Sequence, residues 1–339
     1  MSSGYHVAIA GATGAVGTEF LRVLERHDFP IASLRLLASE RSEGKRIRFA
    51  GEELVVQRLT ENAFEGVQIA FFSAGASRSR QFAPAAVRAG AVVIDNSSAF
   101  RMDPQVPLVV PEINIDDAQH HQGVIANPNC STIIMLMAVA PLHRRWRAKR
   151  VVVSTYQAAS GAGAQAMQEL LDQTAAALEG KEVTPRVLPH QIAFNLFSHN
   201  SAVNEYGYNE EEWKMIHESR KILHEPGLAI TATCIRVPVL RAHSESINIE
   251  FAERRPSVEE ARQALAEFPG VKLVDDRERN HFPMPIEATD REEVLVGRIR
   301  EDVSNPMALD LFVSGDQLLK GAALNAVQIA EAMIARGWL

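Results

Sequence analysis

Residues 6–17 read His-Val-Ala-Ile-Ala-Gly-Ala-Thr-Gly-Ala-Val-Gly, and this stretch decides the fold of the N-terminal half. The apolar run His6–Ala10 is typical of a buried strand, and Ala15–Arg26 has the apolar spacing of an amphipathic helix. Glycines at such a turn let the backbone approach a pyrophosphate held at the helix N-terminus. The G-x-x-G-x-x-G spacing is only moderately specific, so a turn that merely packs the helix on a sheet stays open as an alternative.

The same alternation of strand and helix continues to about residue 126. It predicts a doubly wound parallel sheet of the Rossmann type, with right-handed crossovers. The predicted strands after the first are Leu34–Ala38, Gln68–Phe72, Ala91–Asp95 and Gly123–Ala126, and Phe82–Ala89 is predicted to be helical.

The second half has a different pattern, which predicts an α+β domain with a mostly antiparallel sheet. The region Pro185–Tyr208 is rich in Asn, His, Pro and aromatic residues, and we expect it to be irregular. The predicted strands are Arg150–Tyr156, Ile230–Val239, Glu245–Phe251, Val294–Arg300 and Ala308–Ser314. The predicted helices are Ala164–Leu178, Glu210–Leu223, Val258–Phe268 and a C-terminal helix over Gln317–Ala335.

Length and composition limit the class of protein. At roughly 150 residues per domain, 339 residues predict two domains. With 46% hydrophobic and 23% charged residues, a disordered or fibrous chain is excluded. The net charge of −7 argues against a nucleic-acid or membrane partner. The apolar run Ile133–Leu142 is too short to span a bilayer, and the N-terminus lacks an export signal. Two cysteines provide neither a disulfide framework nor a metal site, so we expect a cytoplasmic protein without a metal.

The residues after the second predicted strand bear on the choice of dinucleotide. Glu40 could bind the ribose 2′-hydroxyl of NAD, as an acidic residue at this position commonly does. Ser39, Arg41 and Ser42 suit the 2′-phosphate of NADP instead. The pattern favours NADP, although each of these residues taken alone also fits a solvated polar turn.

A candidate nucleophile stands in the stretch Ala-Asn-Pro-Asn-Cys-Ser-Thr at residues 126–132, where Cys130 precedes the apolar helical run. Free N–H groups and the positive dipole end of a helix N-terminus stabilise a thiolate, and the same donors can hold an oxyanion. A structural role for Cys130 is the alternative. Cys234 lies inside a predicted strand and fits a small buried hydrophobe. A thiolate beside a dinucleotide site suggests interconversion of an aldehyde and a thioester by hydride transfer.

A series of stretches in fixed order resembles the bacterial aspartate-semialdehyde dehydrogenase family. They are Asn127–Thr132, Gln157–Gly163, Gly207–Lys214, Arg236–His243 and Gly315–Asn325. The resemblance covers the chain from the glycine loop to the C-terminal helix. It implies an NADP-binding domain over residues 1–127, completed by residues 317–339, and a catalytic and dimerisation domain over residues 128–316 of a homodimer. One departure is Ala159, where the family commonly has valine.

The resemblance also implies roles for individual residues. Cys130 would be the nucleophile, and His243 the base that takes the thiol proton and later acts as acid. Gln157, Arg236 and Glu211 would bind the substrate, and Arg101, Lys214 and Asn129 the phosphate. The implied cofactor contacts are Gly11, Thr13, Gly14, Ala15, Val16, Gly17, Arg41, Ser42, Ser160, Gly161 and Gln317.

The implied reaction is NADPH-dependent reductive dephosphorylation of L-4-aspartyl phosphate to L-aspartate 4-semialdehyde and phosphate. The family implies a place in biosynthesis of lysine through diaminopimelate, and of threonine, methionine and isoleucine. One alternative is an N-acetyl-glutamyl-phosphate reductase, against which an anionic Glu211 argues because an amide needs no anionic partner. The other is a non-catalytic nucleotide-binding paralogue, against which the presence of Cys130 and His243 argues.

Overall fold

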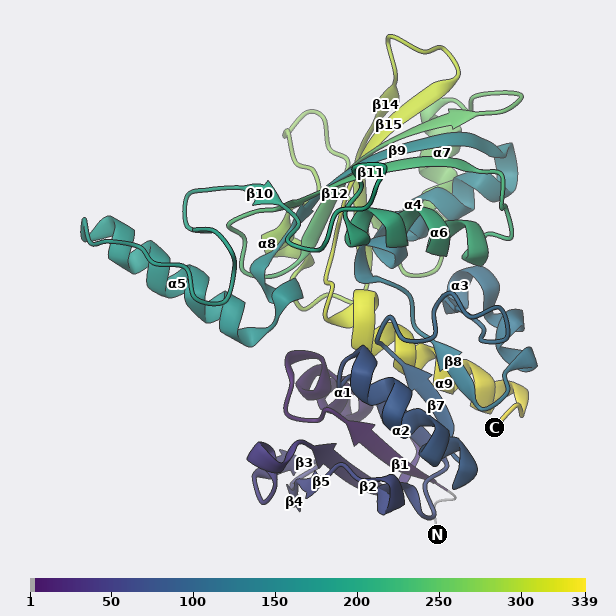
Figure 1. Cartoon of the computed structure of the whole chain (residues 1–339). Coiled ribbons are helices and arrows are strands. Elements are labelled where there is room, and N and C mark those ends of the chain that lie inside the picture. Colours follow the sequence, from purple (N-terminus) through teal and green to yellow (C-terminus); the bar gives the residue numbers. More distant parts are fainter. Residues whose placement is uncertain (1–3) are drawn as a thin grey trace. The chain divides into compact units, whose positions relative to one another are not determined.

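The computed structural model describes residues 4–339, so Met1–Ser3, the start of the expected NADP-binding domain, lie outside the described residues. The chain divides into two compact units. The first consists of the residues up to Asn129 together with Ala322–Leu339, and the second of Cys130–Gly321. In Figure 1 the first unit carries the purple and blue part of the chain and its yellow end.

The first unit is built on a six-stranded sheet in the order β5-β2-β1-β6-β7-β8, and every pair of neighbouring strands in it is parallel. Its strands are β1 Tyr5–Ala10, β2 Ile31–Ala38, β5 Gln57–Arg58, β6 Ile69–Phe72, β7 Val92–Asp95 and β8 Val124–Ala126. Its helices are α1 Ala15–Arg26, α2 Ala76–Arg88, α3 Pro111–Asn114 and α9 Leu324–Arg336. This arrangement confirms the predicted doubly wound parallel sheet.

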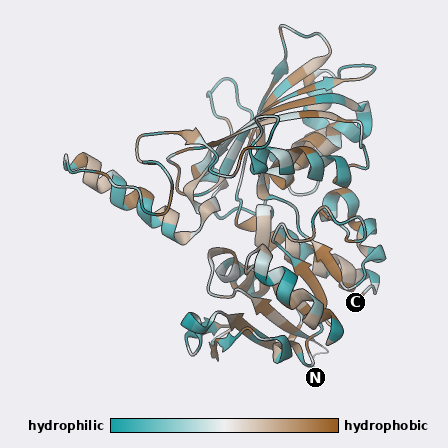
Figure 2. Ribbon diagram, in the orientation of Figure 1, coloured by the Kyte–Doolittle hydropathy of each residue, from teal (hydrophilic) through white to brown (hydrophobic). Residues whose placement is uncertain are grey.

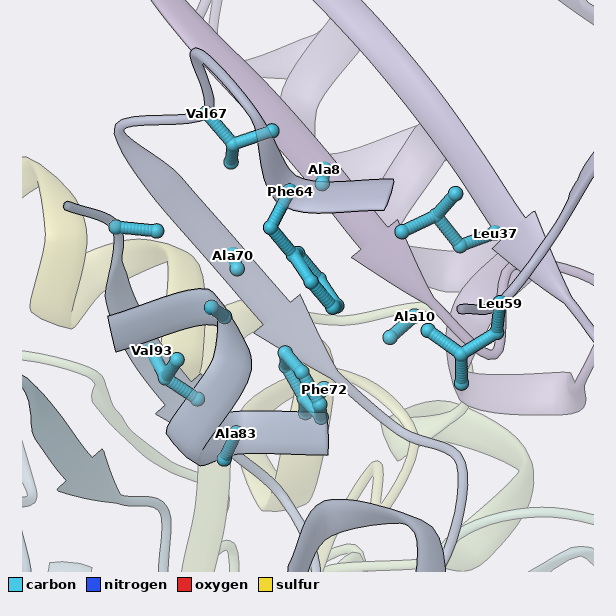
Figure 3. Packing of buried hydrophobic residues seen from close by; sticks show 12 residues of the cluster. Ala8, Ala10, Leu37, Leu59, Phe64, Val67, Ala70, Phe72, Ala83 and Val93 are labelled. Carbon is cyan, nitrogen blue, oxygen red and sulfur yellow. The ribbon is translucent and has the colours of Figure 1, made fainter. Parts of the chain in front are cut away.

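Both faces of this sheet are covered. Neighbouring residues of a strand point to opposite faces, so they pack against different elements. Phe71 packs on Phe20 of α1, with 4.9 Å between ring centroids. The next residue, Phe72, stacks on Phe64 at 5.5 Å on the other face, in the apolar cluster that Figure 3 shows with Ala8. The strands therefore read as nearly continuous apolar runs, which Figure 2 shows as hydrophobic colour along the central strands.

The second unit is built on a seven-stranded sheet in the order β10-β11-β9-β12-β15-β14-β13. Only the β9–β11 and β13–β14 pairs are parallel, which confirms the mostly antiparallel sheet within the described part of the chain. The strands are β9 Ala148–Gln157, β10 Phe197–Ser198, β11 Ala229–Arg236, β12 His243–Phe251, β13 Val271–Leu273, β14 Val294–Glu301 and β15 Ala308–Gly315. The helices are α4 Cys130–Trp146, α5 Ala164–Leu178, α6 Glu210–Ile222, α7 Val258–Ala266 and α8 Pro285–Ala288.

The structure differs from the sequence predictions at several boundaries. The C-terminal stretch is not one helix, because residues 319–323 form a wider π-helical turn before α9 begins at Leu324. Gly321 there lies so close to Cys130 that a Cβ on Gly321 would stand 2.9 Å from the Cβ of Cys130. Helix α2 begins at Ala76, six residues before the predicted start at Phe82, because its first turns are polar. The region predicted to be irregular contains the short strand β10.

The sequence analysis does not predict the hairpin formed by β3 Arg46–Phe49 and β4 Glu52–Val55. Its two turn residues, Ala50 and Gly51, have φ values of 48° and 85°. Two left-handed residues are the geometry of a type I′ turn, for which alanine is an uncommon first residue. Among residues 4–339, no helix combines the length and the apolar character needed to cross a bilayer.

Candidate active site

Cys130 is the first residue of α4, as predicted. The chain leaves β8 at Ala126, passes through Asn-Pro-Asn, and enters a helix whose residues Ser131–Leu142 are all buried. The half-buried Cys130 therefore stands where main-chain N–H groups have no partner within the helix and where the dipole is positive. This location suits a thiolate.

Three strands deliver buried polar side chains to one end of the second sheet. β9 ends at Gln157, and β11, which runs parallel to it, ends at the register partner Arg236. β12 runs the other way and begins at His243, which is paired with Gly315. Gln157, Arg236 and His243 are at most 2% exposed. The structure thus brings Gln157 together with Arg236 and His243, which follow it by 79 and 86 residues in the sequence.

The main chain of Ala158 connects two of these side chains. Its N–H donates to Nδ1 of His243 at 3.0 Å, and its carbonyl oxygen accepts from Nη1 of Arg236 at 2.7 Å. Gly161 packs over the same pair, because a Cβ there would lie 3.0 Å from Cε1 of His243 and 3.1 Å from Nη1 of Arg236. A glycine at position 161 therefore leaves the space that the imidazole and the guanidinium occupy.

Glu211 and Lys214 are placed by the start of α6. A capping box, formed by Asn209 and Glu212, fixes this helix N-terminus. The buried Glu211 carboxylate accepts a hydrogen bond from Nε2 of Gln157 at 3.2 Å and pairs with Nζ of Lys214 at 3.4 Å. The cluster therefore carries an anion and two cations, Arg236 and Lys214, in one unit of the fold.

Burial sets the protonation of the central groups. Burial, followed by the charge of Arg236, lowers the pKa of His243 to about 3. Burial also lowers the pKa of Arg236, while Glu211 and Cys130 act to raise it. The other thiol, Cys234, is fully buried in β11, and burial raises its pKa. Cys234 is therefore a poor nucleophile, in agreement with its assignment as a small buried hydrophobe.

Ser160 and Gln317, which the resemblance assigned to the cofactor, are almost fully buried and hydrogen bond to each other. Oε1 of Gln317 accepts from the N–H of Ala242 at 2.9 Å. Ala242 has a left-handed φ of 71° and directly precedes His243. The side chains of Ser160 and Gln317 thus hold the strained entry to β12.

The glycine loop of the first unit forms a depression of about 160 Å³. Gly11 has a φ of 94°, and a Cβ on Gly17 would lie 2.2 Å from the Gly11 carbonyl oxygen, so both positions require glycine. The hydroxyl of Thr13 donates to Ser42 at 3.2 Å, while the Arg41 side chain is exposed. The lining residues are Gly11, Thr13, Gly14, Ala38, Ser39, Leu59, Ser73, Ala74 and Arg78. Ala15 and Val16 open α1 directly behind the loop.

Charges around this depression fit a phosphorylated dinucleotide. The Glu40 carboxylate pairs with Arg58 at 3.2 Å. Arg41, the cation of the same turn, is therefore not paired with Glu40. Arg78, on the first turns of α2, was missed by the sequence analysis, although it follows the end of β6 closely. Carboxyl ends of parallel strands are the usual position of such a site.

Arg101 and Asn129 belong to the first unit, whereas Lys214 belongs to the second. The Arg101 guanidinium donates to the carbonyl oxygens of Asn127 at 2.9 Å and of Asn96 at 2.8 Å. These main-chain acceptors fix its orientation. Asn129 is buried beside the residue that begins α4.

The comparisons with known proteins agree over the whole chain. Residues 6–121 match the family model described as semialdehyde dehydrogenase, NAD binding domain, and residues 139–320 match that of the semialdehyde dehydrogenase dimerisation domain. An aspartate-semialdehyde dehydrogenase of Synechocystis sp. is 57% identical over 339 residues and 100% of both chains. The crystal structure of aspartate semialdehyde dehydrogenase II of Vibrio cholerae complexed with ASA has a TM-score of 0.95 and 42% identity, covering 98% of this chain and 99% of that one.

A more distant neighbour, aspartate semialdehyde dehydrogenase with NADP from Candida albicans, has a TM-score of 0.76 and 25% identity, covering 99% of this chain and 100% of that one. These findings confirm the family, the fold class and the cofactor that the sequence predicted. The chain belongs to the aspartate-semialdehyde dehydrogenase family of NADP-dependent oxidoreductases.

Proposed function

We propose that this protein reduces L-4-aspartyl phosphate to L-aspartate 4-semialdehyde with NADPH and releases phosphate, through a thioester on Cys130. The observation that carries the proposal is the buried cluster of Arg236, Gln157 and Glu211 in the unit whose first helix starts at Cys130. It provides a cation and an anion side by side, as the α-carboxylate and α-ammonium of an amino acid require.

Each side chain of the cluster has a task in this proposal. The planar fork of Arg236 suits a bidentate bond to the α-carboxylate. Glu211 binds the α-ammonium, and Gln157, already donating to Glu211, orients the substrate near the nucleophile. His243 serves the reacting carbonyl through Nε2, since its Nδ1 is engaged by Ala158.

The phosphate of the substrate needs cations and amide donors. Lys214 provides a charge three residues after Glu211 on α6. Arg101 and Asn129 complete the phosphate contacts in the proposal, and Arg101 is oriented for this by the Asn127 and Asn96 carbonyls.

The residues present fit NADP. Gly11, Thr13, Gly14, Ala15, Val16 and Gly17 would hold the pyrophosphate, Arg41 and Ser42 the 2′-phosphate, and Ser160, Gly161 and Gln317 the remaining contacts. The tight approaches at Gly11 and Gly17 support the first group, because a Cβ at either position would collide with a main-chain oxygen and distort the loop. When bound, the reduced cofactor supplies the hydride.

The proposal includes a homodimer formed through the second sheet. Helices α4, α6 and α7 pack on the strands β12, β11 and β14. The side chains that alternate with the buried ones along these strands stay partly exposed. They include Tyr156 and Phe312, whose ring centroids are 6.0 Å apart. We propose that the same face of a second copy of the chain packs against this face. Sedimentation should give a dimer for the wild type and a shift toward monomer for Phe312→Asp, and a wild-type monomer would contradict this part.

A cytoplasmic location and a place in lysine, threonine, methionine and isoleucine biosynthesis belong to the same proposal. Two free thiols suit a reducing compartment. Deletion of the coding gene should cause a joint requirement for these amino acids and diaminopimelate. Growth of the deletion strain without them would contradict this part.

The test of the substrate is the ratio of kcat/KM for aspartate semialdehyde to that for N-acetylglutamate semialdehyde, measured with NADP and phosphate. We expect a large ratio for the wild type. Glu211→Gln should reduce kcat/KM for aspartate semialdehyde by roughly 30- to 1000-fold, because the α-ammonium loses its charged partner. The matched control is Glu210→Gln, at the neighbouring exposed position of the same helix. A wild-type ratio below one would transfer the assignment to the N-acetylated substrate.

A further inference from the structure

We propose that Asn325, the second residue of α9, is a positioning residue that fixes the orientation of Arg101 through a chain of side-chain amides. The chain runs from Asn325 through the side chain of Asn127 to that of Asn96. Asn325 ends the conserved-order stretch Gly315–Asn325 and had no role assigned to it. The inference rests on the proposed function, in which Arg101 binds the phosphate, and deepens it by naming what orients Arg101.

The chain lies in the first unit, where two neighbouring parallel strands end. β7 ends at Asp95 and β8 at Ala126, and the N–H of Asn127 still donates to the carbonyl oxygen of Asp95 at 2.8 Å. The carbonyl oxygens of Asn96 and Asn127 accept from Arg101, at 2.8 Å from Nη2 and at 2.9 Å from Nε. The orientation of the guanidinium therefore depends on where the two loops place these carbonyl groups.

Side-chain amides tie the two loops together. Nδ2 of Asn127 donates to Oδ1 of Asn96 at 2.7 Å. Oδ1 of Asn127 accepts from Nδ2 of Asn325 at 2.6 Å, and the same Nδ2 donates to the carbonyl oxygen of Val109 at 3.0 Å. Asn127 and Asn325 are fully buried, so water does not compete for these bonds. The chain thus fastens both loops to the first turn of α9, a helix that packs on β7 (Figure 1).

The partner at the end of the chain determines the orientation of each amide. A main-chain carbonyl can only accept, so the NH2 group of Asn325 must face Val109. The same NH2 group then requires the oxygen of the Asn127 amide, which turns the NH2 group of Asn127 toward Asn96. A side chain without a donor at position 325 would deprive two buried acceptors, the Val109 carbonyl and Oδ1 of Asn127, of this hydrogen bond. Such a loss is costly, so the loops would shift toward other donors.

Arg101 would follow such a shift, because it is nearly buried and its acceptors are main-chain groups of the two loops. A planar guanidinium binds phosphate through donors in fixed directions, so a small rotation changes more than one contact at once. Misplacement of a group by about 1 Å can reduce a rate by roughly 100-fold. We therefore expect Asn325 to affect the step that uses phosphate and not the steps before it.

The first measurement compares the wild type with Asn325→Leu, a side chain of similar shape without a donor, in the reaction of aspartate semialdehyde, NADP and phosphate. We expect kcat/KM for phosphate to fall roughly 10- to 100-fold. The burst of NADPH formed without phosphate reports thioester formation alone, and its rate should change by less than about twofold. An unchanged kcat/KM for phosphate, or an equal loss in the burst rate, would overturn the proposal.

The matched control is Val327→Ala, because Val327 is a fully buried residue of the same helix outside the amide chain. This variant should unfold at lower urea concentration than the wild type and keep its kcat/KM for phosphate. Circular dichroism and NADPH binding verify the fold of each variant, and Asn325→Ala replaces Asn325→Leu if the latter does not fold. A phosphate defect in Val327→Ala as large as that in the Asn325 variant would assign the effect to helix packing and overturn the proposal.

A double-mutant cycle shows whether Asn325 acts through Arg101. In the Arg101→Ala background, Asn325→Leu should reduce kcat/KM for phosphate by no more than about twofold further, because the group that it positions is gone. A further loss as large as that in the wild-type background would show that Asn325 acts by another route, which would overturn the proposal.

Equilibrium dialysis with radiolabelled phosphate requires neither substrate nor turnover. We expect the wild type to bind phosphate and Asn325→Leu to bind it roughly tenfold more weakly. Equal binding by the two proteins, or no binding by either, would overturn the proposal. Failure of the proposed function is distinguishable, because a wild type that binds phosphate but does not convert aspartate semialdehyde would still differ from Asn325→Leu in this measurement.

Discussion

Replacing Glu245 with glutamine should remove a pH-dependent cost to folding. Glu245 lies in β12, in register with Thr155 of β9 and Val313 of β15. It is fully buried, and neither of its carboxyl oxygens has a hydrogen-bond partner among the described residues. Burial raises the pKa of Glu245 well above its ordinary value of 4.5. The folded protein therefore keeps a proton that the unfolded chain loses.

The sign and size of the effect follow from proton linkage. Above pH 4.5 the unfolded state binds fewer protons than the folded state, so the free energy of unfolding falls as the pH rises. One proton corresponds to about 1.4 kcal/mol per pH unit, or about 2.7 kcal/mol over two units, until the pH passes the pKa of folded Glu245. Glutamine has nearly the same shape and no ionisable proton, so Glu245→Gln lacks this slope.

The assay is urea unfolding of the wild type and Glu245→Gln at a series of pH values from roughly 5 to 7. The diagnostic quantity is the change with pH of the difference in free energy of unfolding, because an unsatisfied amide adds only a constant. Glu250→Gln is the matched control, since Glu250 lies on the same strand and pairs with Lys149 at 2.6 Å. A difference between wild type and Glu245→Gln that does not vary with pH would refute the reasoning.

Three further predictions concern the site. Cys130→Ala should fold and bind NADPH but show no turnover, whereas Cys234→Ala should keep most activity; iodoacetamide inactivation that follows labelling of Cys234 would reverse the assignment. Arg41→Ala should weaken NADP binding by about 1.5–3 kcal/mol and hardly change NAD binding, and equal losses in calorimetric titrations would show that Arg41 does not contact the 2′-phosphate. Gly161→Ala should fold but lower kcat/KM by roughly 10- to 100-fold, because its methyl group would stand 3.1 Å from Nε2 of His243; unchanged kinetics would contradict the packing described.

Much of the fold was predictable because its signals are local. The parallel sheet of the first unit has strands buried on both faces, which appear as short apolar runs such as Ile69–Phe72. The start of α4 at Cys130 follows from the preceding Asn-Pro-Asn and the apolar run behind it. The hairpin between β3 and β4 was missed because Ala50 gives no turn signal, although it adopts a left-handed φ of 48°.

The inner structure of the site was not predictable, because it depends on the register between distant strands. No local pattern indicates that the main chain of Ala158 contacts both His243 and Arg236, which are 85 and 78 residues away. The pairing of Ser160 with Gln317 is likewise a tertiary contact. The roles of the polar residues came from the family resemblance, whereas their hydrogen-bond partners come only from the structure.

The central claim, a thioester on Cys130, is tested most directly by mixing the enzyme with aspartate semialdehyde and NADP in the absence of phosphate. The account predicts a burst of NADPH of about one equivalent per active site and an aspartyl group on the peptide that contains Cys130, both lost in Cys130→Ala. Adding phosphate should discharge the aspartyl group and restore steady turnover. A burst without a labelled Cys130 peptide, or an aspartyl group on another residue, would contradict the account.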